Sequence, residues 1–405
     1  MSFLRRIGSA IRVPALSILV ALLVGAIFIV VTDIEVIGLL LSDPIGALSL
    51  GIGRAAEAYS ALARGAFGDP ATYAKAFESN GDANLWARAV RPFVESIVSA
   101  VPLIFVGLGV SVAFRTGIFN IGGAGQFTMG AIGGTFAAIL FGAGVTPGPI
   151  AVLLVMAFGI LGGAAWAFIP GFLKARVGAS EVITTIMLNF IASNILFFVL
   201  INVQFVQKPP FIQPISKELS QFVNLPGLLP IESLRLDVSF VIALLTAVAV
   251  SWFLFRSTRG FELRAAGLNM AAAKYAGMGA AKSIITAMLI SGAISGLGGA
   301  LVVVGTVKQL SPGIAGSVGF TAIAIALVGG TRPSGVVATA LVFGLLQNGS
   351  RLMQLETGIP LEMLLFIQSL VIAFIAAPDL TLRILQNPFQ SILRMIKKRP
   401  PEEAR

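Results

Sequence analysis

The sequence contains no cysteine and no histidine in its 405 residues, and only 11% of the residues are charged. The absence of cysteine excludes disulfides and thiolate metal sites. The absence of histidine removes the most common general base, proton shuttle and transition-metal ligand of proteins. We therefore expect no catalytic residue, no metal site and no cofactor, and a membrane enzyme is less favoured than any class of transporter.

Apolar sequence is abundant instead, with 57% hydrophobic residues and a mean hydropathy of +0.95. A soluble domain carries roughly a quarter charged residues. A helix needs about 20 largely apolar residues to cross a bilayer. The sequence thus predicts an all-α, polytopic membrane helix bundle that forms a single domain over residues 1–405. About ten crossings are predicted, at 14–31, 92–113, 118–141, 149–170, 182–201, 238–255, 283–305, 315–330, 334–349 and 360–377. The shortest two, 315–330 and 334–349, are candidates for partial crossings.

Lysine and arginine gather in alternate connections, whereas most acidic residues lie in the others. Cytoplasmic loops of membrane proteins carry the excess of basic residues. We therefore place both termini, the loop 256–282 and the basic tail 380–405 in the cytoplasm. The net charge of +10 reflects these topology signals, because the basic residues form no patch with interleaved aromatics, so no nucleic acid partner is expected.

The first span could be either a signal peptide or a membrane helix, because Arg5, Arg6 and Arg12 precede its apolar run, as in a signal peptide. The run 14–31 is longer than an ordinary signal core and ends without a small-x-small cleavage pattern. We predict that it is retained as the first membrane helix.

Two extracytoplasmic segments are long. The segment 32–91 contains an alanine-rich stretch near 54–67, which predicts short surface helices. The second, residues 202–237, contains five prolines and is called the proline-rich segment below. Each is either a docking surface for an extracytoplasmic partner or a solvated connector, and the sequence leaves both alternatives open.

The loop 256–282, called the basic loop below, is the most informative segment. It predicts two short helices. Gly267 can end the first through a positive φ, Asn269 is a good N-cap for the second, and Gly277 can end that second helix.

The basic loop also carries apolar side chains that water alone would not favour, at Phe261, Leu263, Met270 and Tyr275. A pair of helices that carries such apolar side chains suits insertion into a groove of another protein. The alternative is an interfacial helix whose apolar side rests among lipid headgroups.

A glycine-rich segment runs from Arg115 to Gly130 and includes Asn120, Gly122, Gly125 and Gln126. Buried amides are costly against lipid, so Asn120 and Gln126 should face the bundle interior or a wet cavity. The glycines permit either close helix packing or an unwound stretch that lines a pathway. The segment lacks the lysine and hydroxyl residue of a P-loop, so any ATP must be held by a partner.

Residues 180–194 offer further polar groups in an apolar span. Glu181 behind Ser180 fits the N-terminus of a helix, whereas Asn189 and Asn194 lie deeper and are candidates for a solute pathway.

Several of these motifs resemble one known family, the permease subunits of bacterial ABC importers of the branched-chain amino acid, ribose and nucleoside branch. The resemblance covers roughly residues 90–380. It is carried by the runs 264–269 and 272–277, by 291–300, and by Phe119–Gly122 with Gly125 and Gln126. The run 180–189 resembles the nucleoside-type permeases in particular.

The resemblance implies a multi-pass protein of the bacterial inner membrane that takes up nucleosides. It implies a cytoplasmic ATP-binding subunit, a second and unlike permease subunit, and an extracytoplasmic solute-binding protein as partners. It also implies that the basic loop couples to the ATPase, through Arg259, Gly260, Glu262, Arg264, Gly267, Leu268, Asn269, Lys274, Tyr275 and Gly277. The implied solute pathway includes Asn120, Gly122, Gly125, Gln126, Asn189 and Asn194.

Two alternatives stay open. A ribose-type sugar permease shares the same motifs. A secondary transporter driven by protons or sodium usually places ionisable residues at mid-membrane, and here only Glu95 and Glu362 come near, each close to the end of a predicted helix.

Overall fold

The computed structural model of the protein describes residues 2–376 with the exception of 80, 143, 145 and 232. The predicted basic tail 380–405 lies outside the described residues. The described part is helical, and its only β-type pairings are two isolated bridges. Its helices confirm the all-α class: α1 Ser2–Thr32, α2 Ile34–Leu39, α3 Pro44–Phe67, α4 Pro70–Glu78, α5 Ala83–Arg115, α6 Gly123–Phe141, α7 Gly148–Val177, α8 Glu181–Asn202, η1 Gln221–Val223, α9 Ser239–Arg256, α10 Thr258–Leu268, α11 Met270–Tyr275, α12 Ala280–Val302, η2 Val303–Val307, α13 Val318–Val328, α14 Pro333–Thr357 and α15 Leu361–Ala376.

Each predicted span coincides with a helix. Among the described residues, seven helices are long and apolar enough to cross a membrane, namely α5, α6, α7, α8, α9, α12 continued by η2, and α14. The stretch Leu16–Thr32 and helix α13 are apolar but shorter.

Several predicted boundaries differ from the ends of the helices, among them the beginnings of α5 and α6. Helix α5 begins at Ala83 instead of residue 92, because Asp82 caps it by accepting a hydrogen bond from the Asn84 amide at 2.8 Å. Helix α6 begins at Gly123 instead of residue 118, so the chain is unwound between α5 and α6.

The two short predicted spans differ from each other. Helix α13 has 11 residues and, at about 1.5 Å per residue, is too short to cross a bilayer. Helix α14 has 25 residues and is long enough. The length of α13 therefore confirms the prediction of a partial crossing at 315–330, whereas the length of α14 shows that this prediction is wrong at 334–349.

The chain divides within α3 and α14 into two compact parts, whose described residues are 2–63 with 350–376, and 64–349 without 80, 143, 145 and 232. In the first part, α1 packs against α15, and the Ser17 hydroxyl donates to the Phe374 carbonyl at 3.1 Å. Helix α3 buries Ala58 and Ala61 against Ile29 and Met353. The alanine-rich stretch thus lies within a longer helix that has one buried face.

The second part is built around α12, which packs against α5, α6 and α7. Glycine backbones lie in direct contact where α6, α7 and α12 cross: a Cβ on Gly130 would lie 2.2 Å from the Gly296 Cα, and one on Gly163 would lie 2.1 Å from the Gly292 carbonyl oxygen. Small residues permit such close approach of membrane helices, which maximises their van der Waals contact.

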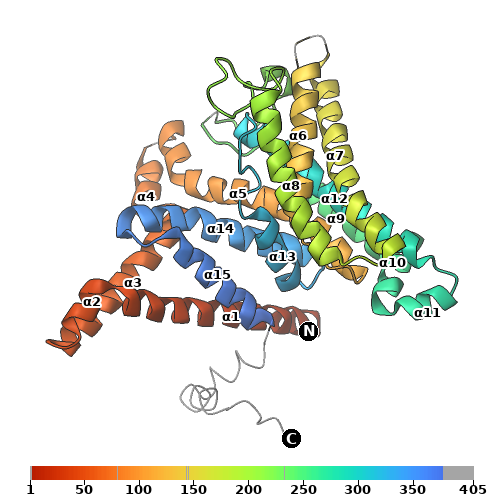
Figure 1. Ribbon diagram of the computed structural model, residues 1–405. Helices are drawn as coiled ribbons and strands as arrows, with labels where there is room; N and C mark the ends of the chain where they lie inside the picture. The colour runs from red at the N-terminus through yellow and green to blue at the C-terminus, as the bar shows by residue number, and fades with distance from the viewer. Residues whose placement is uncertain (1, 80, 143, 145, 232, 377–405) are drawn as a thin grey trace, which may run out of the picture. The chain divides into compact units, whose positions relative to one another are not determined.

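Helix α12 also links two surface segments. Its first turns contact the basic loop through Ile284, which packs with Leu263. The chain just beyond η2 contacts the proline-rich segment, where Leu310 and Ser216 exchange hydrogen bonds. Figure 1 shows α10 and α11 at one end of this helix group and the proline-rich segment, in green, at the other. The two segments therefore lie at opposite ends of the crossing helices.

Candidate functional site

The basic loop consists of two short helices, as predicted. Ser257 caps α10 by accepting a hydrogen bond from the Gly260 amide at 2.9 Å. Asn269 caps α11 by accepting one from the Ala272 amide at 3.0 Å. Gly277 follows α11 with φ +81°. The predicted roles of Asn269 and Gly277 are confirmed.

The predicted role of Gly267 was wrong. Gly267 lies inside α10, which continues to Leu268, and its φ is not positive. Glycine is required there for a different reason. A Cβ would lie 2.2 Å from the Arg115 carbonyl oxygen, so the loop can lie against the end of α5 only without a side chain at this position.

The apolar side chains of the basic loop divide into two groups. Leu263 is buried with Ala113, Ile118 and Met288, and Met270 packs against this cluster. Leu263 and Met270 were expected to be exposed apolar side chains, but their packing anchors the loop to the membrane helices. The outward-facing group comprises Leu268, Tyr275 and Phe261, with 90%, 93% and 54% of their surface exposed.

Arg264 fixes the loop to α9 at Phe255, and Arg115 at the end of α5 lies near the same ring. The Arg264 guanidinium lies 5.3 Å from the ring centroid and the Arg115 guanidinium 5.4 Å. The Arg264 Nε also donates to the Leu254 carbonyl at 2.9 Å. Arg264 was predicted as a coupling residue, and its contacts make it a positioning residue for the loop.

A cavity of about 640 Å³ lies between α10, the end of α11 and the start of α12. Four basic side chains and one acid line it: Arg256, Arg259, Arg264, Lys282 and Glu262. Glu262 is already paired with Arg259 at 3.1 Å. The cavity therefore presents a net positive charge. Lys274 and Tyr275, which directly precede its lining residue Ala276, are exposed, and so is Leu268 at the end of α10.

The unwound stretch between α5 and α6 holds Asn120, which is fully buried. Its Nδ2 donates to the Ser291 hydroxyl at 2.8 Å and to Gln126 Oε1 at 3.2 Å. Its Oδ1 accepts from the Gly122 amide at 2.8 Å and from Gln126 Nε2 at 3.2 Å. The two amides thus connect the unwound stretch, α6 and α12, and their place in a solute pathway stays a prediction.

Asn189 on α8 is engaged in the same region. Its Oδ1 accepts from the Gly125 amide at 2.8 Å and its Nδ2 donates to the Ile121 carbonyl at 3.0 Å. It therefore satisfies one backbone group of the unwound stretch and one free amide in the first turn of α6. Asn194 instead donates to the Phe190 carbonyl of its own helix at 2.8 Å and is exposed.

Replacing Asn120 by leucine tests whether this residue holds the structure or contacts solute. The substitution leaves Gln126 and Ser291 without their buried partner, so we expect a loss of about 3 kcal/mol in unfolding free energy. Thermal unfolding of the purified protein measures the loss, and the KM of uptake by the surviving protein should be unchanged. A raised KM with unaltered unfolding would instead place Asn120 in the pathway.

Glu181 begins α8 behind Ser180, as predicted, but the Ser180 side chain makes no capping hydrogen bond. Glu181 pairs with Lys174 near the end of α7, at 2.8 Å. This ion pair joins the ends of two consecutive helices.

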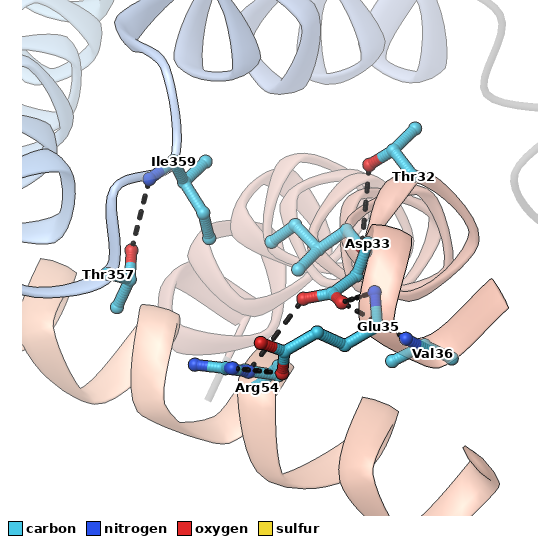
Figure 2. Close-up of polar contacts among 8 residues, drawn as sticks. Thr32, Asp33, Glu35, Val36, Arg54, Thr357 and Ile359 are labelled. Atoms are coloured by element: carbon cyan, nitrogen blue, oxygen red, sulfur yellow. Dashed lines mark hydrogen bonds and ion pairs between the residues drawn. The ribbon is translucent and has the colours of Figure 1, made fainter. Parts of the chain in front are cut away.

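Sequence reasoning missed a polar cluster in the first compact part, where a cavity of about 430 Å³ lies beside Asp33, Glu35 and Arg54. Figure 2 shows Arg54 of α3 reaching both acids, at 2.6 Å to Glu35 and 3.7 Å to Asp33, while Asp33 caps α2. The hydrogen bond to Glu35 raises the pKa of Arg54. The sequence signal for this cluster was two acids directly after α1 and one arginine on α3. The cluster joins α2 to α3.

The helices and these two polar regions define a membrane-spanning transport subunit. The chain belongs to the family described as branched-chain amino acid transport system / permease component, which matches residues 93–376. It is therefore a permease subunit of an ABC importer, a transport component of the cell membrane and not an enzyme. Such a permease works with an ATP-binding subunit and a solute-binding protein.

Three relatives are similar over most of their length. The guanosine ABC transporter permease protein NupP of Bacillus subtilis is 35% identical over 374 residues, covering 91% of this chain and 94% of the relative. The nucleoside ABC transporter permease protein NupB of Lactococcus lactis subsp. cremoris is 35% identical over 297 residues, covering 71% and 80%. The glucose ABC transporter permease protein TsgB13 of Haloferax volcanii is 34% identical over 294 residues, covering 70% and 76%. No solved structure gives a significant match.

Proposed function

We propose that this permease imports nucleosides, with both termini and the basic loop in the cytoplasm. The observation that carries the substrate class is the similarity to a guanosine permease along 91% of the chain. The similarity to a glucose permease makes sugar import the second candidate. Nucleosides and sugars are both neutral and rich in hydroxyl groups.

The basic loop is the proposed contact with the ATP-binding subunit. Leu268 and Tyr275 are the apolar anchors, and the positively charged cavity beside them accepts an acidic segment of that subunit. Exposed anchors of this kind, next to a complementary charge, are typical of helix-in-groove recognition. ATP hydrolysis then moves the loop, and α5 and α12 follow because Leu263 is packed between them.

The pathway is proposed to run beside the unwound stretch at Asn120, Gly122, Gly125 and Gln126. A second, unlike permease subunit is part of the proposal. It is supported by the resemblance of the glycine-rich segment and of the basic loop to permeases that work as pairs. Copurification of two differently tagged copies of this chain in the absence of another permease would contradict the unlike pair.

Uptake by the complete transporter in vesicles tests the proposed function. We expect labelled guanosine to accumulate only when ATP is supplied on the side of the ATP-binding subunit. A tenfold excess of unlabelled nucleoside should suppress the signal, whereas glucose should not. Accumulation driven by an imposed sodium or proton gradient without ATP would contradict the proposal, and suppression by glucose alone would favour the sugar permease.

A further inference from the structure

A second polar cavity lies at the end of α12 away from the basic loop. Its volume is about 630 Å³, within the range of about 300–1,000 Å³ that small-molecule sites occupy. The proline-rich segment forms one wall with Asn224, Arg235 and Asp237. The end of η2 and the residue that follows it form another wall with Gly305 and Lys308.

Asp237 lines this cavity, and one of its two carboxylate oxygens has no partner. The residue is only 5% exposed. Its Oδ1 accepts a hydrogen bond from the Ser239 amide at 2.7 Å, whereas its Oδ2 is buried and has no hydrogen-bond partner among the described residues. Burial raises the pKa of this carboxyl. A buried acceptor without a donor is unfavourable, and a bound hydroxyl group would supply that donor.

Lys308 lies on the same cavity in a backbone conformation that favours glycine, with φ +62° directly after the π-helix η2. Its Nζ donates to Asn224 Oδ1 at 3.0 Å and to the Val304 carbonyl at 2.9 Å. An ammonium group has three donors, so one remains for a ligand. Strained residues and π-helical turns occur preferentially at functional sites.

The charges of the cavity balance. Lys308 lies opposite Asp237, and Arg235 is held by Glu95 through a two-pronged ion pair with Nε to Oε1 at 2.9 Å. The charged side chains of the cavity therefore offer one free acceptor and one free donor without net charge. This combination suits a neutral ligand whose groups both donate and accept, and it suits neither an anion nor a metal cation.

We infer that this cavity is a solute site within a single permease subunit, where the Asp237 carboxylate turns toward the cavity to accept from a hydroxyl group and Lys308 donates to a neighbouring oxygen. The ribose of a nucleoside carries two adjacent hydroxyl groups that meet both requirements. The inference rests on the proposed function, because it takes the imported solute as the ligand.

Binding of tritiated guanosine to the purified transporter, in the absence of the solute-binding protein, tests the site. The variants are Asp237→Asn, which removes the charged acceptor, and Lys308→Gly, which removes the donor while fitting the backbone. We expect each to bind guanosine about tenfold more weakly or worse, as the loss of a hydrogen bond to a charged group predicts. The wild-type protein should also prefer guanosine over 2′,3′-dideoxyguanosine, and Asp237→Asn should abolish that preference.

The control is Glu218→Gln, which alters an exposed carboxylate of the same segment that is paired with Lys208 at 2.7 Å outside the cavity. It should bind guanosine like the wild type. Thermal unfolding should show that Asp237→Asn is at least as stable as the wild type, because it removes a buried carboxylate oxygen that has no hydrogen-bond partner. Unchanged guanosine binding in Asp237→Asn, or no binding by the wild type, overturns the site. Absence of ATP-driven guanosine and nucleoside uptake by the wild type overturns the proposed function instead.

Discussion

Replacing Leu268 and Tyr275 together by aspartate is expected to reduce both uptake and solute-stimulated ATP hydrolysis about tenfold or more. The two side chains are 90% and 93% exposed and fill no space within the chain, so their loss removes contacts only with a partner. Anchors of an interface typically contribute about 2 kcal/mol or more each when truncated, and about 1.4 kcal/mol is a factor of ten. ATP hydrolysis by the reconstituted transporter, with and without loaded solute-binding protein, measures the effect.

The change should leave the permease itself intact. The Asn269 cap and the anchor at Leu263 are retained, so the thermal unfolding temperature of the purified chain should not move. Val177→Asp is the matched control, because Val177 is 73% exposed at the end of α7, the end that packs near the basic loop through Ala175. It adds a negative charge outside the proposed interface. Full stimulation in the double variant would exclude these two side chains as the coupling contact.

The features of the basic loop that the sequence predicted are those decided by local chemistry. Asn269 caps α11 through an amide only three residues away, and Gly277 adopts its positive φ within its own turn. The spans were predictable for a similar reason, since hydropathy along a helix requires no knowledge of its neighbours. Local rules therefore located the elements and the segment of interest.

Gly267 shows where local rules end. A glycine near the end of a helix can be explained either by a positive φ or by a close contact with another backbone. At Gly267, only the position of the Arg115 carbonyl distinguishes these two explanations. Leu263 and Leu268 likewise look alike in sequence, yet one is buried and the other exposed, because the neighbouring α5 and α12 determine which side is covered.

The polar groups required knowledge of distant partners. Asn120 and Gln126 were recognised as costly to bury, but their satisfaction by each other and by Ser291 of α12 depends on how the helices pack. The cavity at Asp237 was missed altogether. Its signal in the sequence is a single acid directly before an apolar span, and membrane topology alone accounts for an acid at that position.

Replacing Gly296 by valine should destabilise the fold more than the other substitutions proposed for this chain. A Cβ at this position would lie 2.3 Å from the Gly159 carbonyl oxygen and 2.8 Å from the Gly163 Cα. Both neighbours are backbone atoms of α7, so no flexible side chain can move aside. Helices α7 and α12 must separate, and α6 loses its contact at Gly130. Overpacking of this kind costs about 3 kcal/mol or more.

Yield after membrane extraction and the thermal unfolding temperature in detergent measure this loss, and Gly296→Ala should show a smaller loss in the same direction. Gly53→Ala provides the comparison, because Gly53 lies in α3 with no atom within 4 Å of an added Cβ. Alanine favours a helix over glycine by about 1 kcal/mol, so that variant should be at least as stable as the wild type. The same glycine-to-alanine substitution should therefore lower the stability when made in α12 and not lower it when made in α3, because the two sites differ in helix packing. If Gly296→Ala unfolded at the same temperature as the wild type, α7 and α12 would not meet at their glycines.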